Sequence, residues 1–238
     1  MRYGMRRLGL AAALFCGCAA AQVCDPPKLI GPYGFQLSGI TTISGEEKPT
    51  TSVGRLVFDG HGGLSGRSSA MFSGYLLGNP VTGSYELKTD CSLTWKLQDD
   101  SGNYQNFGGK ISSDLLRAQF RQTDPGGPHQ GVLQRTPEKC SDQDLRTRYT
   151  YTVSGSTTPM IEGEKRRTVS AKGTLDVARN GTFSVDSDCT VTFDLAVLRP
   201  DQLLDTIKMR GILVDGGREI LAIETDAGAM VAGRFSAN

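Results

Sequence analysis

The sequence predicts an all-β fold made of two tandem homologous antiparallel modules, each a small up-and-down barrel or sandwich. Three observations predict it. Glycine is abundant, with 30 residues in 238; apolar and polar side chains alternate along short segments; and one half of the chain repeats in the other. Alternation gives a strand one buried and one solvent-facing side. Stretches of helical period are nearly absent after residue 21.

The alternation is clearest where Tyr85 and Leu87, then Leu93, Trp95 and Leu97, are separated by polar residues. Turn signals lie between such runs, as in Asp59-Gly60, Asn180-Gly181 and Asp215-Gly216. Asn-Gly and Asp-Gly readily adopt the positive φ that tight hairpin turns require. We therefore expect antiparallel meanders, and closure into a barrel would remove exposed strand edges.

The internal repeat keeps the order of its matches while their spacing changes once. Gly54-x-Leu56-x-Phe58 returns as Gly173-x-Leu175-x-Val177, at an offset of 119, and residues 83–97 match 181–195 at an offset of 98. The second copy therefore lacks about 21 residues found within 62–82. We expect the missing piece to be a hairpin, because its loss preserves the direction of every later strand; a long strand with its crossing loop is the alternative. The modules are then 22–137 and 138–238.

The first 21 residues predict a signal peptide. Arg2, Arg6 and Arg7 precede an apolar run from residue 8 to 21 that ends in three alanines, which is typical of a secretory signal cleaved before Gln22. About fourteen apolar residues are too few to span a bilayer. We expect a secreted or periplasmic protein without a transmembrane segment; a lipid anchor on Cys18, which follows Gly17, is the alternative.

Charge gives no sign of a nucleic-acid or lipid surface. The full chain has 26 basic and 25 acidic side chains, and without the predicted signal, which contributes three arginines, its net charge is near −2. Binding to nucleic acid normally requires a clear basic excess. We therefore expect no nucleic-acid partner.

Four cysteines remain after the predicted cleavage: Cys24, Cys91, Cys140 and Cys189. An even number in an exported chain predicts disulfides, and four cysteines permit three pairings. If one ancestral module held one bridge, the pairs are Cys24 with Cys91 and Cys140 with Cys189. The swapped pairing, Cys24 with Cys189 and Cys91 with Cys140, stays open. C-x-x-C spacing is absent and the chain has only two histidines, so we expect no metal and no cofactor.

Candidate functional residues are few. Tyr85, Trp95 and Phe193 are aromatic residues on predicted central strands, which either line a ligand cavity or belong to the core. Asp124 and Asp226 repeat in Thr-Asp-x-Gly, where they either meet as a carboxylate dyad or organise two turns. We interpret the two histidines, His61 and His129, as exposed loop residues and assign no catalytic residue.

The motifs Tyr-x-Phe-x-Leu-x-Gly, Gly-x-Leu-x-Phe-Asp-Gly-x-Gly and Gly-x-Tyr-x-Leu-x-x-Asp-Cys span residues 33–91. They resemble those of uncharacterised exported bacterial proteins whose small barrels are similar to lipocalins and related calycins. The resemblance implies a cup for a small apolar molecule. We expect a non-enzymatic binding protein of this kind. The alternatives are a structural or surface interaction protein with solid cores and, less favoured, an enzyme that uses residues at the barrel mouth.

Overall fold

A computed structural model describes residues 23–43, 46–100, 102–125, 129–160, 162–163, 165–179, 182–198 and 204–237. The predicted signal peptide, Cys18 and the Asn180-Gly181 turn lie outside the described residues. The described chain is all-β, as predicted, with three short 3₁₀ turns: η1 (Pro26–Lys28), η2 (Asp142–Asp144) and η3 (Asp215–Gly217).

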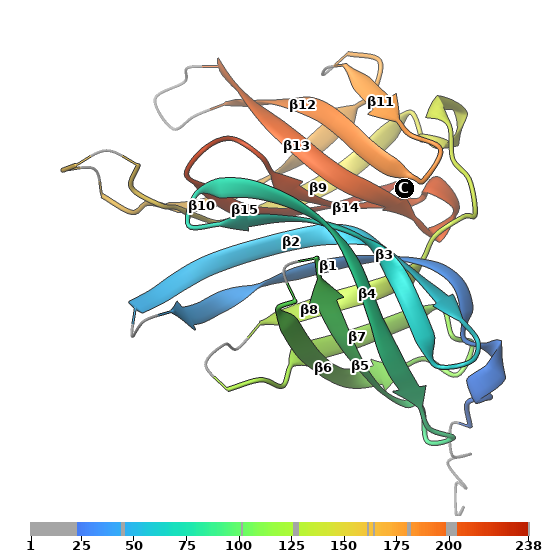
Figure 1. Cartoon of the computed structure of the whole chain (residues 1–238). Helices are drawn as coiled ribbons and strands as arrows, with labels where there is room; N and C mark the ends of the chain where they lie inside the picture. The colour runs from blue at the N-terminus through green and yellow to red at the C-terminus, as the bar shows by residue number, and fades with distance from the viewer. Residues whose placement is uncertain are drawn as a thin grey trace, which may run out of the picture.

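The first half of the chain forms a closed antiparallel barrel in which each strand pairs with its neighbours in sequence and the last pairs with the first. Figure 1 shows this barrel in blue to green. Its strands are β1 (Ile30–Ile43), β2 (Glu46–Asp59), β3 (Gly63–Phe72), β4 (Tyr75–Leu87), β5 (Ser92–Asp99), β6 (Tyr104–Ile111), β7 (Arg117–Gln122) and β8 (Gln130–Arg135).

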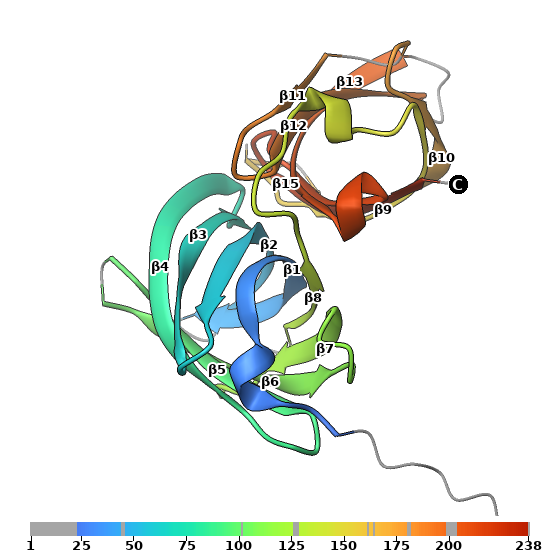
Figure 2. The same cartoon turned by 90° about the vertical axis from the view of Figure 1, so that its right-hand side faces the viewer.

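The second half forms a seven-stranded antiparallel sheet in the order β10-β9-β15-β14-β13-β12-β11. Viewed along its strands in Figure 2, this sheet is strongly curled. Its strands are β9 (Arg148–Thr157), β10 (Thr168–Asp176), β11 (Phe183–Val185), β12 (Thr190–Leu198), β13 (Leu204–Val214), β14 (Glu219–Glu224) and β15 (Ala229–Ala237). The closure that we expected in both modules is found only in the first, because β10 and β11 remain unpaired edges among the described strands.

Residues 62–82, for which the sequence comparison of the two halves found no match, form β3, a turn and the first half of β4. The predicted hairpin therefore exists, but its second arm continues into a long strand. Its turn reaches the second sheet, where the Gly228 N–H donates to the Gly74 carbonyl at 2.9 Å. Gly74 has a φ of 85°, a conformation that glycine adopts at little cost. The extra hairpin thus contributes to the contact between the two halves.

Each half has its own disulfide, and the predicted pairing is confirmed. Cys24 is bonded to Cys91, and Cys140 to Cys189, across sequence separations of 67 and 49 residues. Both bridges tie the segment that enters a sheet to a turn just before a strand, β5 in the barrel and β12 in the second sheet. The two disulfides suggest an oxidising, extracytoplasmic environment.

The barrel and the second sheet pack against each other through their outer faces. Val53 and Met71 point out of the barrel and lie in the same buried cluster as Ile212 and Val214. Gln36 is also outward-facing, and its Nε2 donates to the Ala222 and Gly233 carbonyls at 2.6 and 2.8 Å. Because these outer positions are buried between two sheets, the halves form one packed unit.

Candidate functional site

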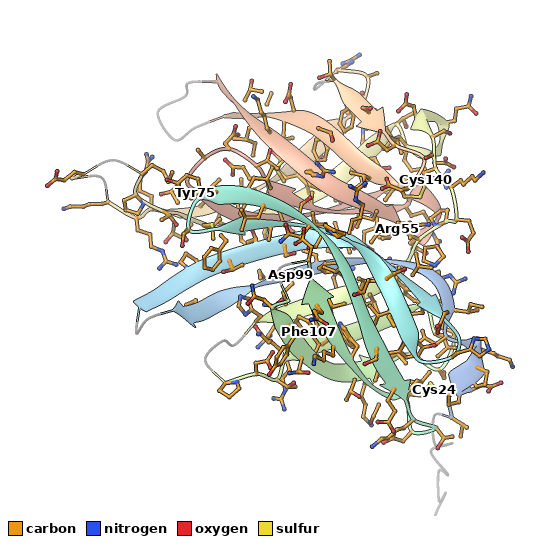
Figure 3. All side chains as sticks on the ribbon, in the orientation of Figure 1. Cys24, Arg55, Tyr75, Asp99, Phe107 and Cys140 are labelled. Carbon is orange, nitrogen blue, oxygen red and sulfur yellow. A yellow bond between two sulfur atoms is a disulfide. The ribbon has the colours of Figure 1, made fainter. Side chains whose placement is uncertain are left out.

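The part of the barrel interior between β5, β6 and β7 is packed with aromatic rings. Trp95 is 4% exposed, and its ring centroid lies 5.4 Å from that of Phe107 and 4.7 Å from that of Phe120. Phe107 and Phe120 meet edge to face at 5.6 Å, an arrangement that aromatic pairs favour. Figure 3 shows Phe107 among the side chains inside the barrel. Trp95 is therefore part of a ring cluster that occupies the position where we considered a ligand.

The part of the interior between β1, β2 and β4 is also filled with aromatic rings. Phe58 lies edge to face with Tyr33 at 5.2 Å and with Tyr85 at 4.9 Å. The Tyr85 hydroxyl donates to the Leu29 carbonyl at 3.0 Å, and the Tyr33 hydroxyl donates to the Leu115 carbonyl at 2.7 Å. Burial raises the pKa of both phenols above the ordinary value. These tyrosines act as core residues with satisfied hydroxyls.

Phe193 is buried inside the second sheet. It is 2% exposed, stacks on Phe183 at 5.0 Å and meets Phe235 edge to face at 5.1 Å. The side chain thus packs inside the curled sheet. It lies in a different buried cluster from Tyr85 and Trp95.

Asp124 and Asp226 each bind the neighbouring strand of their own sheet. The Asp124 carboxylate accepts from the Asn106 backbone N–H at 2.5 Å, and the Asp226 carboxylate accepts from the Lys208 N–H at 2.8 Å. Burial raises the pKa of Asp124, but hydrogen bonds from Asn106 and Gln122 outweigh it and the pKa lies below its ordinary value. A lowered pKa suits a turn-forming carboxylate, whereas a proton-sharing dyad would raise one of the two.

His129 differs from the prediction. Although it adjoins a turn, it is 1% exposed, because the alternation of β8 continues past the strand end and turns the ring into the barrel. Its Nδ1 lies 2.5 Å from Gln122 Oε1, which can only accept, so Nδ1 carries the proton. The Nε2 atom is buried without a partner among the described residues, and burial lowers the pKa of this histidine.

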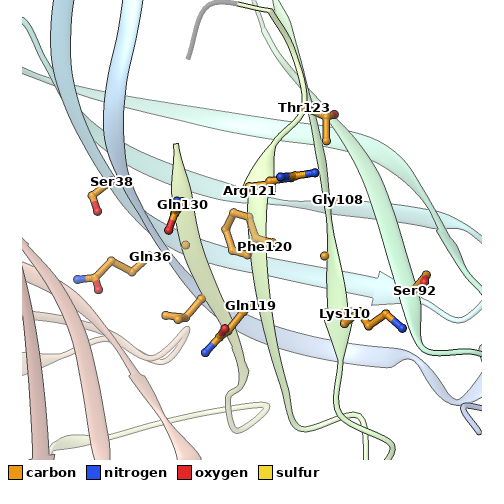
Figure 4. A pocket seen from close by; sticks show the side chains of 13 residues that line it. Gln36, Ser38, Ser92, Gly108, Lys110, Gln119, Phe120, Arg121, Thr123 and Gln130 are labelled. Carbon is orange, nitrogen blue, oxygen red and sulfur yellow. The ribbon is translucent and has the colours of Figure 1, made fainter. Parts of the chain in front are cut away.

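The clearest hollow lies on the outer wall of the barrel, over β6, β7, β8 and β1. It has a volume of about 740 Å³, and a second hollow of about 470 Å³ continues it toward β15. The two share Lys110, Gln119 and Val132. We call them together the outer groove. Figure 4 shows Lys110, Gln119 and Arg121 along it, with Gln36 on the side nearer the second sheet.

Three glycines lie in the wall of the outer groove. Gly108, Gly109 and Gly131 line it. At Gly109 a Cβ would lie 2.1 Å from the Gln119 carbonyl oxygen, and at Gly131 it would lie 2.4 Å from that of Gln36. Because real Cβ atoms do not approach backbone that closely, a larger residue at either position would shift the strands. Gly109 and Gly131 thus lie at inward positions beside the buried Phe120 and leave room for its ring inside the barrel, whereas Gly108 faces outward and leaves its part of the groove wall without a side chain.

The charges of the outer groove have one sign. Lys110 and Arg121 line the first hollow, Arg117 and Arg234 line the second with Lys110, and neither hollow is lined by an Asp or Glu among the described residues. Amide side chains add hydrogen-bonding capacity, from Gln119 and Gln130 above all. Such a surface attracts anionic groups and offers donors and acceptors for hydroxyls.

One buried carboxylate anchors the end of the outer groove without lining it. Glu219 is 4% exposed and accepts hydrogen bonds from Arg234, from Arg117 at 3.4 Å and from Gln134 at 2.9 Å. Arg117 also pairs with Asp215 at 3.2 Å. These contacts hold Arg117 and Arg234 in place between the barrel and the second sheet. Lys110 and Arg121, in contrast, form no ion pair with any described carboxylate.

Sequence reasoning missed the outer groove. Lys110, Gln119 and Arg121 occupy outward positions of alternating strands, which predict solvent exposure and nothing more. Their convergence depends on strand neighbours, and a wall of the groove comes from the packing of a second sheet. Two glycines in succession, Gly108-Gly109, were the available signal, because glycine inside a strand often marks a close approach.

In comparisons with known proteins, no protein-family model matches the chain, and no curated protein matches its sequence. Within the described ranges, no helix is long and apolar enough to span a membrane. The same residues contain no group of three or more His, Cys, Asp or Glu side chains placed to hold a metal ion.

Proposed function

We propose that this chain is an exported, non-enzymatic interaction protein, built from two copies of one β module, that binds an acidic polysaccharide along the outer groove. The observation that carries the proposal is a cationic groove, lined by no Asp or Glu of the described chain, on the wall of a barrel whose interior is packed. A packed interior favours the surface interaction protein over the carrier of a small apolar molecule. Export rests on the N-terminal signal pattern and on the two disulfides.

The strand order supports a duplication. Replacing each barrel strand by its sequence match turns β2-β1-β8-β7-β6-β5-β4 into the order of the second sheet, with β3 missing. The cross-strand register also matches. Tyr33 faces Leu56 and Tyr149 faces Leu175, while Tyr85 faces Trp95 and Phe183 faces Phe193.

The turns at the disulfides support it further. Cys91 and Cys189 both have positive φ, 64° and 69°, which non-glycine residues seldom adopt. The Cys24 N–H donates to the Thr89 carbonyl, and the Cys140 N–H donates to the Ser187 carbonyl. Because these unusual details recur at matching positions, descent from one module explains them more simply than chance.

The chemistry of the outer groove favours a sugar polymer over a peptide. A peptide that adds to a sheet needs an unpaired strand edge, and the residues of β1, β6, β7 and β8 that line the groove pair with a strand on each side. Amides and hydroxyls, including Gln119, Gln130 and Ser92, instead suit the hydroxyl groups of a saccharide. Lys110 and Arg121 would meet its carboxylates. An open groove, rather than an enclosed cavity, suits an extended polymer.

Titration calorimetry of the oxidised protein with polygalacturonate tests the proposal, with dextran as the uncharged comparison. We expect Lys110→Glu and Arg121→Glu to weaken binding about tenfold each, equivalent to about 1.4 kcal/mol. Lys88→Glu is the matched control, because Lys88 is an exposed barrel lysine outside the groove. Equal binding of dextran, tighter binding of polyglutamate, or an equal loss in the control would reject the proposal.

A further inference from the structure

The open edge of the second sheet is the clearest feature that the outer groove does not explain. Strand β10 pairs with β9 on one side only, whereas its counterpart β2 pairs with β1 on one side and β3 on the other. The inference below rests on the proposed correspondence of the two sheets and not on the polysaccharide site. Among the described strands, none of the second sheet takes the place that β3 fills in the barrel.

The backbone of β10 is available for a further ladder. Just after β10, the Val177 N–H donates to the Thr147 carbonyl, and just before it, the Arg167 carbonyl accepts from the Thr157 N–H. Since hydrogen-bonding groups alternate in direction along an antiparallel strand, odd-numbered residues of β10 point their backbone groups to β9. The even-numbered N–H groups, including those of Ser170, Lys172 and Thr174, point to the open side.

The inward side chains along this edge are incompletely covered. Leu175 is fully buried, but Val169 and Ala171 are only partly buried against the core of the second sheet. The outward residues Ser170 and Lys172 are exposed. An added strand with small apolar residues on its inward face would therefore cover Val169 and Ala171 while its other face remained in solvent.

The charge at this edge favours an acidic strand. Residues 165–179 contain five basic side chains and one acidic one, and Lys172 lies at the centre of β10. A central lysine is a common protection against pairing of identical edges, because a second copy would bring the same positive charges. An opposite charge directly across from Lys172 would instead stabilise the pair.

We propose that β10 accepts an extended segment of a partner polypeptide, which adds as an antiparallel strand with an Asp or Glu opposite Lys172. The barrel gives the register. Gly54 corresponds to Gly173, so Lys172 corresponds to Val53, and Val53 faces Ser69 of β3. The added strand thus resembles β3 with an acidic residue at the Ser69 position.

Two peptides test this register. Both copy Gly63–Phe72, one with Ser69→Glu and the other with Ser69→Lys. Fluorescence anisotropy of the labelled peptides with the whole oxidised protein measures their affinities. We expect the Glu peptide to bind about two- to fivefold more tightly than the Lys peptide. In the Lys172→Glu variant the order is expected to reverse, and in the control Lys88→Glu it is expected to stay unchanged.

Hydrogen exchange locates the added strand. Binding of the Glu peptide should slow exchange at the amides of Ser170, Lys172 and Thr174. Ser170→Pro should weaken both peptides, because proline removes an N–H that faces the open side and leaves the β9 ladder intact. If the Ser170→Pro variant fails to fold, the reversed peptide preference of Lys172→Glu still tests whether the added strand pairs with β10.

Three results would overturn the proposal: no change in exchange at the even-numbered amides, no reversal of preference in Lys172→Glu, or a dimer held by β10 that the peptide dissociates. The last result would assign the edge to a second copy of this chain. None of them bears on polygalacturonate binding, so the two proposals fail separately.

Discussion

Replacement of Trp95 by alanine distinguishes a packed barrel from a ligand cup. Trp95 is 4% exposed and its ring contacts both Phe107 and Phe120. Truncating a core tryptophan or phenylalanine in a packed interior removes apolar burial and leaves a cavity, at a cost of about 3 to 5 kcal/mol. Small domains are stable by about 5 to 15 kcal/mol, so the variant should lose a large part of its stability.

Urea unfolding followed by circular dichroism measures this loss. Tyr104→Ala is the control, because Tyr104 is 58% exposed and lies outside the barrel beneath Lys96, whose Nζ is 4.0 Å from the ring centroid. Loss of that exposed contact should cost about 0.5 to 1 kcal/mol. If Trp95→Ala cost no more than the control, the ring would border space that is already empty, and the packed interior would be refuted.

Four further outcomes are expected. Tyr33→Phe and Tyr149→Phe should each cost about 1 kcal/mol in urea unfolding, because each buried hydroxyl donates to a carbonyl, at 2.7 and 2.8 Å; sharply unequal losses would speak against equivalent modules. Reduction of both disulfides should remove about 4 kcal/mol per bridge in the chain-entropy model, and an unchanged melting temperature would contradict this. Glu219→Ala should cost about 2 kcal/mol, less than a fully buried pair, since Arg117 and Arg234 are half exposed; a neutral result would remove the anchoring role. His129 has a lowered pKa through burial, so the unfolded chain takes up its proton first as the pH falls; stability should decline below about pH 6.5, the ordinary pKa, and His129→Gln should flatten that decline in melting curves.

Much of the fold could be predicted because local patterns determined it. Alternation around Trp95 gave the correct buried face, whereas the Asp124 carboxylate bonds to Asn106 on a neighbouring strand, a contact that its turn motif did not predict. The change of repeat offset located the segment that forms β3 and the first half of β4. The disulfide pairing followed from the assumption of one bridge in each ancestral module.

The remainder depended on contacts that alternation does not encode. Gln36 and Val53 occupy outward positions that look solvent-facing, yet the second sheet buries Val53 and partly covers Gln36, which bonds to the Ala222 carbonyl. His129 follows a Gly- and Pro-rich stretch of sequence that predicts an exposed loop, yet its ring points into the barrel. Closure was expected in both halves, but among the described strands the second sheet keeps two edges, β10 and β11.

The most direct test of the central claim, an outward-facing site on a packed barrel, is the map of NMR shifts caused by polygalacturonate. Trp95 is the only tryptophan in the chain, so its indole N–H reports on the interior without ambiguity. We predict that the amides of Gly108, Gly109 and Gly131 shift on titration while the Trp95 indole signal stays in place. A shift of the Trp95 signal with unmoved glycine amides would place the ligand inside the barrel and contradict the account.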